Sequence, residues 1–376
     1  MQQLKNRVYF DSASTTPVDP EVLKQYKALL DDHYVNSESL YDEGIAINKL
    51  LNTSRKYIAD YFKVNQDSII FTSCASEANN LAIKGISLLN KEKNHIITTK
   101  IEHSSVLNAI KQLETYFGYN VTYLDVDKNG HIDIDMLKSS INDKTCLVSI
   151  MYVNNEIGSI NDINYIKSII KQYPKTYLHV DAVQALGKID IDFNDIDLLT
   201  VSAHKIYGLK GSGILIKRNN VKLLPLINGG QQEFGLRGGT SDAIKHIMFA
   251  KTLRLYITKC KEKNDYLSQL KNYLITKISE TDKINMNIND PELYIFSINT
   301  PINSEIMLNA LNKQNIMVSA LSTCHSASTT SHVLQAIGLN EDTIRKSIRI
   351  SIDFNNTIQE IDYLINTIKE IIIKYE

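Results

Sequence analysis

The middle of the chain, residues 68–217, alternates short runs rich in Ile, Val, Leu and Tyr with longer segments of helical character. Continuous apolar runs of this length are typical of strands buried on both faces, and helical spacers between them favour a largely parallel sheet. The runs lie at residues 68–73, 95–99, 121–124, 146–153, 178–181, 198–202 and 213–216. The pattern therefore predicts an α/β architecture with a mainly parallel central sheet.

The region after about residue 250 has a different pattern. It contains a long stretch of mixed polar and apolar residues and a final helix with one apolar face. That face carries Ile358, Ile361, Leu364, Ile365, Ile368 and Ile372. We therefore expect a large α/β domain at residues 13–255 and a smaller α+β domain formed by residues 1–12 and 256–376.

Composition narrows the class of protein. Of the 376 residues, 43% are apolar, which argues against a disordered chain. The 41 Lys and Arg balance the 42 Asp and Glu, which argues against binding to nucleic acid or to a membrane surface. No stretch approaches the roughly 20 apolar residues that span a bilayer, and the N-terminus lacks a secretory signal. We therefore expect a cytoplasmic protein. Its four cysteines are too scattered for a disulfide framework or a structural zinc site.

Two polar residues follow strands of the predicted sheet. Asp181 ends the run at 178–181, and Lys205 comes just after the run at 198–202. Because ligand-binding residues gather at the carboxyl ends of parallel strands, both side chains can face one crevice. Read singly, Asp181 would cap a helix and Lys205 would lie at the surface. Together, a carboxylate that keeps a ring nitrogen protonated and a lysine that forms a Schiff base describe a site for pyridoxal 5'-phosphate (PLP).

Several further motifs lie along the chain in the order in which a known family carries them. The chain resembles the cysteine desulfurases of the NifS/IscS type, which belong to the class V aminotransferase group of PLP enzymes of fold type I. The resemblance runs from residues 9–17 to residues 347–351. It implies PLP as the cofactor, L-cysteine as the substrate and a homodimer. It also implies roles around the cofactor ring: Lys205 would form the Schiff base, Asp181 would pair with the pyridine nitrogen, Gln184 would lie near the phenolic oxygen, and His103 would stack on the ring and move protons.

The cofactor's phosphate needs a cluster of donors, which residues 72–80 can supply as a strand end followed directly by a helix start. Backbone N–H groups at such a position bind anions, with help from the helix dipole. The resemblance assigns phosphate contacts to Ala75, Ser76, Ser202, His204 and, from the neighbouring subunit, Thr240.

The substrate would be held and attacked by residues from distant segments. By the resemblance, Arg349 would bind the substrate carboxylate through its planar fork, and Asn154 would add an amide near the same group. Cys324 would attack the sulfur of PLP-bound cysteine, which leaves a persulfide on the enzyme and alanine as the product. Either His325 or His103 could take the proton of the thiol.

The chain departs from the family pattern in two loops. Cys74 replaces the glycine of the usual Gly-Ala-Thr, and Leu321 replaces a glycine ahead of the nucleophile, which puts the mobility of that loop in question. His325 and His332 fit no common zinc spacing, so we expect no metal site.

The destination of the sulfur stays open in the sequence. A sulfur-acceptor protein could serve iron–sulfur cluster assembly or the thiolation of tRNA or of a cofactor. Alternatives on the same scaffold are a selenocysteine lyase and an aminotransferase for small substrates, and transamination needs no thiol. An alternative of another class is a catalytically silent interaction protein with a PLP fold. The enzyme is favoured by the joint presence of Lys205, Asp181, His103, Cys324 and Arg349.

Overall fold

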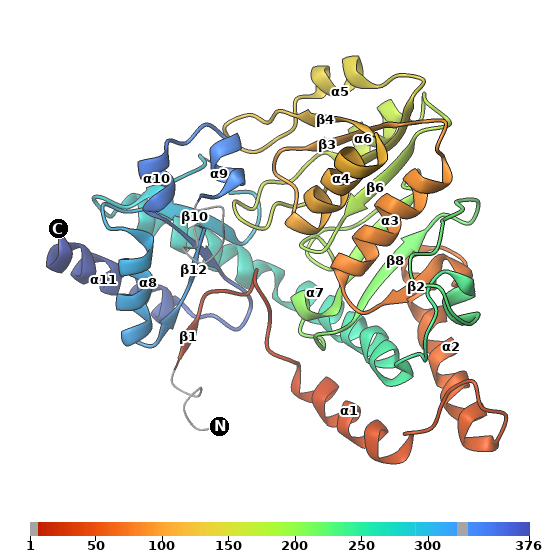
Figure 1. Ribbon diagram of the computed structural model, residues 1–376. Coiled ribbons are helices and arrows are strands. Elements are labelled where there is room, and N and C mark those ends of the chain that lie inside the picture. The colour runs from red at the N-terminus through yellow and green to blue at the C-terminus, as the bar shows by residue number, and fades with distance from the viewer. Residues whose placement is uncertain (1–6, 290, 322–329) are drawn as a thin grey trace.

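A seven-stranded sheet forms the centre of the larger part of the molecule (Figure 1). The computed structural model describes residues 7–289, 291–321 and 330–376. The strand order is β2-β8-β7-β6-β5-β3-β4, and β8 runs antiparallel to both neighbours while the other pairs are parallel. The strands are β2 (Ile69–Thr72), β3 (His95–Thr99), β4 (Asn120–Leu124), β5 (Thr145–Met151), β6 (Tyr177–Asp181), β7 (Leu198–Ser202) and β8 (Gly213–Lys217).

Helices cover both faces of this sheet. On one face α3 (Ala75–Leu89) and α4 (Ser104–Phe117) enclose an apolar core, and on the other a larger core forms with α2 (Asp42–Phe62), α6 (Ile163–Ile170) and the first part of α7 (Ala243–Ser279). Strands β5 and β7 are buried along their whole length. This is why they read as continuous apolar runs, as strands of a sheet covered on both sides do. The α/β prediction is confirmed.

Shorter elements complete the larger part. They are α1 (Pro20–Asp32), α5 (Ile134–Ser140) and the 3-10 helices η2 (Gln66–Ser68), η3 (Ala203–Lys205) and η4 (Gln232–Gly235). Helix α1 starts where the Asp19 side chain accepts from the Glu21 N–H and Pro20 takes the first helical position, a common helix start.

The smaller part has a four-stranded antiparallel sheet and its own core. The sheet order is β12 (Ser319–Ala320), β13 (Ser347–Ser351), β10 (Ile295–Asn299) and β9 (Asn285–Met286), and β1 (Val8–Tyr9) pairs in parallel with β11 (Ile316–Met317). Its helices are α8 (Ser304–Lys313), α9 (His332–Ala336), α10 (Glu341–Arg345) and α11 (Ile358–Tyr375). Most of the predicted apolar face of α11 is buried here, although Ile358 is exposed.

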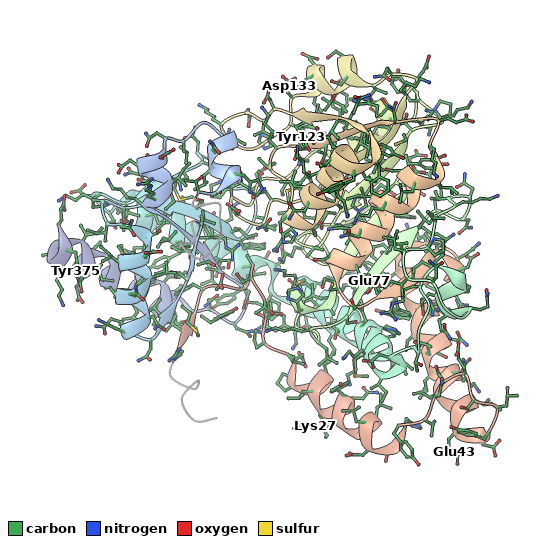
Figure 2. All side chains as sticks on the ribbon, viewed as in Figure 1. Lys27, Glu43, Glu77, Tyr123, Asp133 and Tyr375 are labelled. Carbon is green, nitrogen blue, oxygen red and sulfur yellow. The ribbon has the colours of Figure 1, made fainter. Side chains whose placement is uncertain are left out.

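Helix α7 joins the two parts. Its first half contributes to the large core, and Leu270, Leu274 and Ile278 of its second half contribute to the small one. The expected boundary at residues 255–256 falls inside this continuous helix, and the division into two domains stays a prediction. Figure 2 shows Glu43 of α2 and Tyr375 of α11 at opposite ends of the molecule. Within the described ranges, none of the helices combines the length and apolar character that crossing a bilayer requires.

Candidate active site

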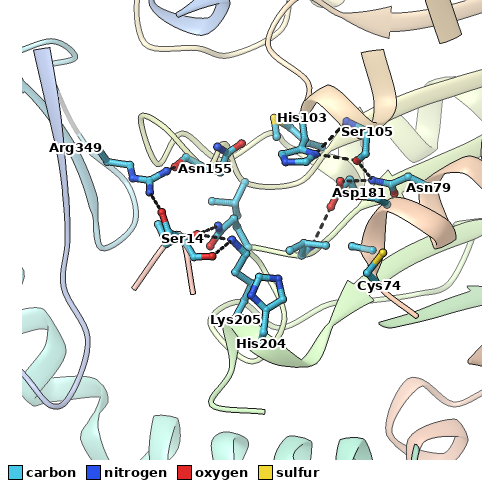
Figure 3. A pocket seen from close by; sticks show the side chains of 17 residues that line it. Ser14, Cys74, Asn79, His103, Ser105, Asn155, Asp181, His204, Lys205 and Arg349 are labelled. Atoms are coloured by element: carbon cyan, nitrogen blue, oxygen red, sulfur yellow. Dashed lines mark hydrogen bonds between the residues drawn. The ribbon is translucent and has the colours of Figure 1, made fainter. Parts of the chain in front are cut away.

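A cavity of about 390 Å³ opens at the carboxyl ends of the parallel strands (Figure 3). Its walls come from residues that end or follow β2, β3, β5, β6 and β7, from Ala13 and Ser14, and from Arg349 on β13. Segments more than 300 residues apart in the sequence therefore meet in one place. Ligand sites of open α/β sheets lie at this edge.

Lys205 reaches into the cavity from η3, the short turn directly after β7. Its Nζ donates to the carbonyl oxygens of Ala13 at 2.6 Å and Ser14 at 2.7 Å. Burial, and after it the positive charges of Arg349 and Lys188, lower the pKa of Lys205 to about 7. A large share of this amine is therefore uncharged near neutral pH, which makes it nucleophilic enough to form a Schiff base.

Asp181 ends β6 and is 6% exposed. One carboxylate oxygen, Oδ2, accepts from Asn79 Nδ2 at 2.8 Å, and the other, Oδ1, accepts from the Val183 N–H at 3.1 Å. These bonds hold the carboxylate at the cavity wall, where it suits a protonated ring nitrogen of a ligand.

His103 caps the start of α4, and its ring is exposed to the cavity. Its Nδ1 lies 2.8 Å from Ser105 Oγ and accepts from the Ser105 N–H at 3.2 Å. Desolvation by the surrounding protein lowers the pKa of His103 below its ordinary value; the charge of Asp181 opposes this shift, and that of Lys205 adds to it. The direction of the shift favours the neutral ring.

Arg349 extends from β13 to the side of the cavity opposite Asp181 (Figure 3). Its Nη2 forms an ion pair with Asp11 Oδ1 at 2.8 Å, and its Nη1 donates to the Asn155 carbonyl at 2.8 Å. The side chain is 7% exposed, and within the described residues its buried Nε has no hydrogen-bond partner. A fixed cation with an unused donor can receive a carboxylate.

The start of α3 offers an anion site in the same cavity. Cys74, Ala75 and Ser76 line the wall, and the Cys74 side chain makes no capping bond. The first N–H groups of a helix lack acceptors within the helix, so they can bind a phosphate. A Cβ atom on Gly213 would lie 2.5 Å from the Cys74 carbonyl carbon, so this turn packs directly against β8. The donors present thus fit the phosphate of PLP.

Most of the residues expected around the cofactor do line this cavity. They are Ala75, Ser76, His103, Asp181, Gln184, His204, Lys205 and Arg349. Two others do not: the Ser202 hydroxyl donates to the Ser212 carbonyl at 3.4 Å, and Thr240 is exposed away from the cavity. Their phosphate contacts stay predictions. Cys324 and His325 lie outside the described residues.

Asn154 lies outside the lining of the cavity, and its contact with the substrate stays a prediction. Its amide is fully buried, where Nδ2 donates to the Ile101 carbonyl at 3.0 Å and Oδ1 accepts from the Glu156 and Ile157 N–H groups. The same Nδ2 also donates to Met151 Sδ at 3.3 Å, so the side chain holds the loop after β5 together with both of its N–H groups engaged. Its neighbour Asn155 lines the cavity instead.

Sequence reasoning also missed three polar residues: Asn79 and Ser105, which line the cavity, and Lys188, which lies outside its lining. Asn79 and Ser105 connect Asp181 with His103, and Lys188 donates to Gln184 Oε1 at 3.0 Å. The contact between Lys188 and Gln184 could have been predicted from their spacing of four residues. The contact between Asn79 and Ser105 could not have been predicted from the sequence, because it depends on how α3 packs beside α4.

Comparison with known proteins places the chain in a family. The family model described as aminotransferase class-V matches residues 8–364. The chain belongs to this family. It is 40% identical over 380 residues to the cysteine desulfurase IscS of Clostridium botulinum, covering 98% of this chain and 95% of that relative. It is 39% identical to a cysteine desulfurase of Nostoc sp., covering 97% and 92%. A solved structure described as a NifS-like protein superposes with a TM-score of 0.91 at 34% identity, covering 98% of this chain and 100% of that one.

These similarities confirm the resemblance inferred from the motifs, the fold type I architecture and the expectation of a PLP-dependent enzyme of the cysteine desulfurase class. They do not assign a role to any residue of this chain, nor a sulfur acceptor or an oligomeric state.

Proposed function

We propose that this class-V family member converts L-cysteine to L-alanine and holds the sulfur as a persulfide on Cys324 until an acceptor protein takes it. The observation that carries the proposal is the placement of Lys205 and Asp181 at the carboxyl ends of neighbouring strands, with Arg349 across the same cavity. The names of the relatives supply the substrate class.

The cofactor would be held at three points. Lys205 would bind the aldehyde of PLP, Asp181 would accept from the pyridinium N–H, and the first N–H groups of α3 would bind the phosphate. When bound, PLP supplies the electron sink that stabilises the charge left when a substrate proton is removed.

The substrate's carboxylate would bind to Arg349, whose guanidinium already points into the cavity beside Asn155. We propose the Asn155 side chain, in place of Asn154, as the amide near this group. Lys205 would remove the α-proton, since its low pKa keeps it partly neutral at pH 7.

Cys324 would take the sulfur. The residues on either side of the segment 322–329 support this role. Leu321 packs in a cluster with Met151, which also lines the cavity, and the Ser331 hydroxyl donates to Glu156, the neighbour of Asn155.

A second copy of the chain would complete the site by bringing Thr240 to the phosphate. Support comes from exposed apolar side chains: Leu40 is 90% exposed, and Phe234, six residues before Thr240, is 53% exposed. The acceptor protein would serve iron–sulfur cluster assembly or thiolation of tRNA or of a cofactor. The cytoplasmic location stays a prediction.

The test is to incubate the PLP-loaded protein with L-cysteine, to measure alanine, and to search the Cys324 peptide for the mass of one added sulfur. We expect both products in the wild type and neither in Cys324→Ala. Cys260→Ala is the matched control, because Cys260 lies outside the cavity lining, and it should behave as the wild type. Alanine without the added sulfur would remove Cys324 from its role.

The same assay separates the alternatives. Full turnover by Cys324→Ala would favour an aminotransferase, and faster turnover of selenocysteine than of cysteine would favour a lyase. PLP binding without any turnover would favour a silent interaction protein.

A further inference from the structure

A chain of hydrogen bonds connects Asp181 to His103 along the wall of the cavity (Figure 3). Asn79 Nδ2 lies 2.8 Å from Asp181 Oδ2 and 2.8 Å from Ser105 Oγ. Ser105 Oγ in turn lies 2.8 Å from His103 Nδ1. Asn79 is fully buried, so water does not compete for its bond to Asp181, whereas the bond between Ser105 and His103 lies at the exposed end of the chain of bonds.

The chemistry of the groups fixes the direction of each bond. An ionised carboxylate only accepts, so the NH₂ end of the Asn79 amide must face Asp181. The second N–H of that NH₂ group then points to Ser105 Oγ, which accepts it. The Ser105 hydroxyl proton is left to donate to His103 Nδ1.

A second contact reaches the same ring nitrogen independently. The backbone N–H of Ser105 donates to His103 Nδ1 at 3.2 Å, and a backbone N–H can never accept. Since Nδ1 faces two donors, it carries no proton. In a neutral imidazole the proton must then be on Nε2. The edge of the ring away from Ser105 faces the cavity (Figure 3).

We propose that Asn79 and Ser105 are positioning residues that lock His103 as the Nε2–H tautomer, so that the ring presents a hydrogen-bond donor, and no base, to the cavity. The consequence for the reaction rests on the proposed function, whereas the tautomer does not. A ring in this state has no lone pair on Nε2 and cannot take a proton from the cavity. The proton of the attacking thiol must therefore go to another base, such as Lys205 or water, while the Nε2–H of His103 donates a hydrogen bond and keeps its proton.

The test compares two serines at the start of α4. Ser105→Ala removes the hydroxyl that donates to His103, and Ser105→Thr restores one. Ser104→Ala is the matched control, because Ser104 is the exposed neighbouring residue in the same helix turn. The PLP-loaded proteins are labelled with ¹⁵N-histidine, the His103 signals are assigned with a His103→Gln variant, and kcat and KM for L-cysteine are measured alongside.

We expect the wild-type His103 signals to show an unprotonated Nδ1 and a protonated Nε2. In Ser105→Ala the Nδ1 signal should move toward that of a mixture of tautomers, and kcat should fall about 3- to 10-fold with little change in KM, as for the loss of one hydrogen bond. Ser105→Thr should recover most of kcat, and Asn79→Ala should weaken the lock in the same direction.

Three results would overturn the proposal. They are a protonated Nδ1 in the wild type, a His103 spectrum unchanged in Ser105→Ala, and an equal change in Ser104→Ala. The NMR readout does not require turnover, so a protein that locks the tautomer but makes no alanine would refute the proposed function and leave this inference standing.

Discussion

Glu102 is a buried carboxyl group whose protonation should make the stability of the fold depend on pH. It is 0% exposed, and its Oε1 accepts from Thr99 Oγ1 and from the Met151 N–H, both at 2.8 Å. Within the described residues its Oε2 has no partner. Burial raises the pKa of Glu102 to about 8, so the folded protein keeps this proton at neutral pH.

The sign of the effect follows from linkage. The pKa of Glu102 is higher in the folded chain than in the unfolded chain, where it is near the ordinary value of 4.5. Between these two values only the unfolded chain loses the proton, so the free energy of unfolding falls as the pH rises through this window. At about 1.4 kcal/mol per pKa unit, the loss between pH 5 and pH 8 amounts to roughly 3–4 kcal/mol.

The assay is urea unfolding of the wild type and of Glu102→Gln, both PLP-loaded, at several pH values from 5 to 8. The amide of the variant would keep an oxygen for Thr99 and Met151 and cannot titrate. We therefore expect the stability of the variant, relative to the wild type, to rise by several kcal/mol over this range. Glu305→Gln, at the exposed start of α8, controls for the loss of a carboxyl group. Parallel pH curves for Glu102→Gln and the wild type would refute the reasoning.

Three other buried contacts give further predictions. The rate at which the apoprotein captures PLP should rise with pH around a midpoint near 7, the pKa of Lys205, as measured by stopped-flow absorbance; a midpoint near 10 would contradict it. Gly213→Ala should weaken PLP binding in equilibrium dialysis, because the new methyl group would collide with the Cys74 backbone at the phosphate cradle. Glu233→Gln should cost about 3–5 kcal/mol in urea unfolding, because it leaves the buried Arg55 guanidinium without its bidentate partner; a loss below about 1 kcal/mol would contradict it.

The strands of the large sheet were predictable because a strand that is buried on both faces is a continuous run of apolar residues in the sequence. The run at 198–202 coincides with β7, and the run at 121–124 differs from β4 by one residue. The direction of β8 was not predictable in the same way. Its apolar run suits either orientation, and its antiparallel pairing with β7 follows from the short connection after Lys205.

The position of a residue in the cavity was predictable where that residue ends a strand or comes directly after one. Asp181 is the last residue of β6, and Lys205 closes the turn after β7. Asn154 and Asn155 show the limit of this reasoning. Both residues follow β5. An isolated β-bridge pairs Val153 with Ile160, and within the loop that it closes the Asn154 amide points inward, whereas Asn155 lines the cavity. Which of two adjacent side chains faces a ligand depends on such turns, which the residue types alone do not determine.

In the proposed mechanism, the electrostatics of the cavity would link substrate binding to the chemistry of Lys205. After burial, the Arg349 charge is the largest cause of the low pKa of this lysine. A carboxylate that binds to Arg349 adds negative charge beside it and so offsets this repulsion. The pKa of Lys205 must therefore rise once the substrate is in place. A lysine that is partly neutral in the free cavity can form a Schiff base, and with the proposed substrate bound the same amine would become a stronger base for the α-proton. In this mechanism one arginine, placed on β13 of the smaller sheet, would serve both recognition and proton transfer.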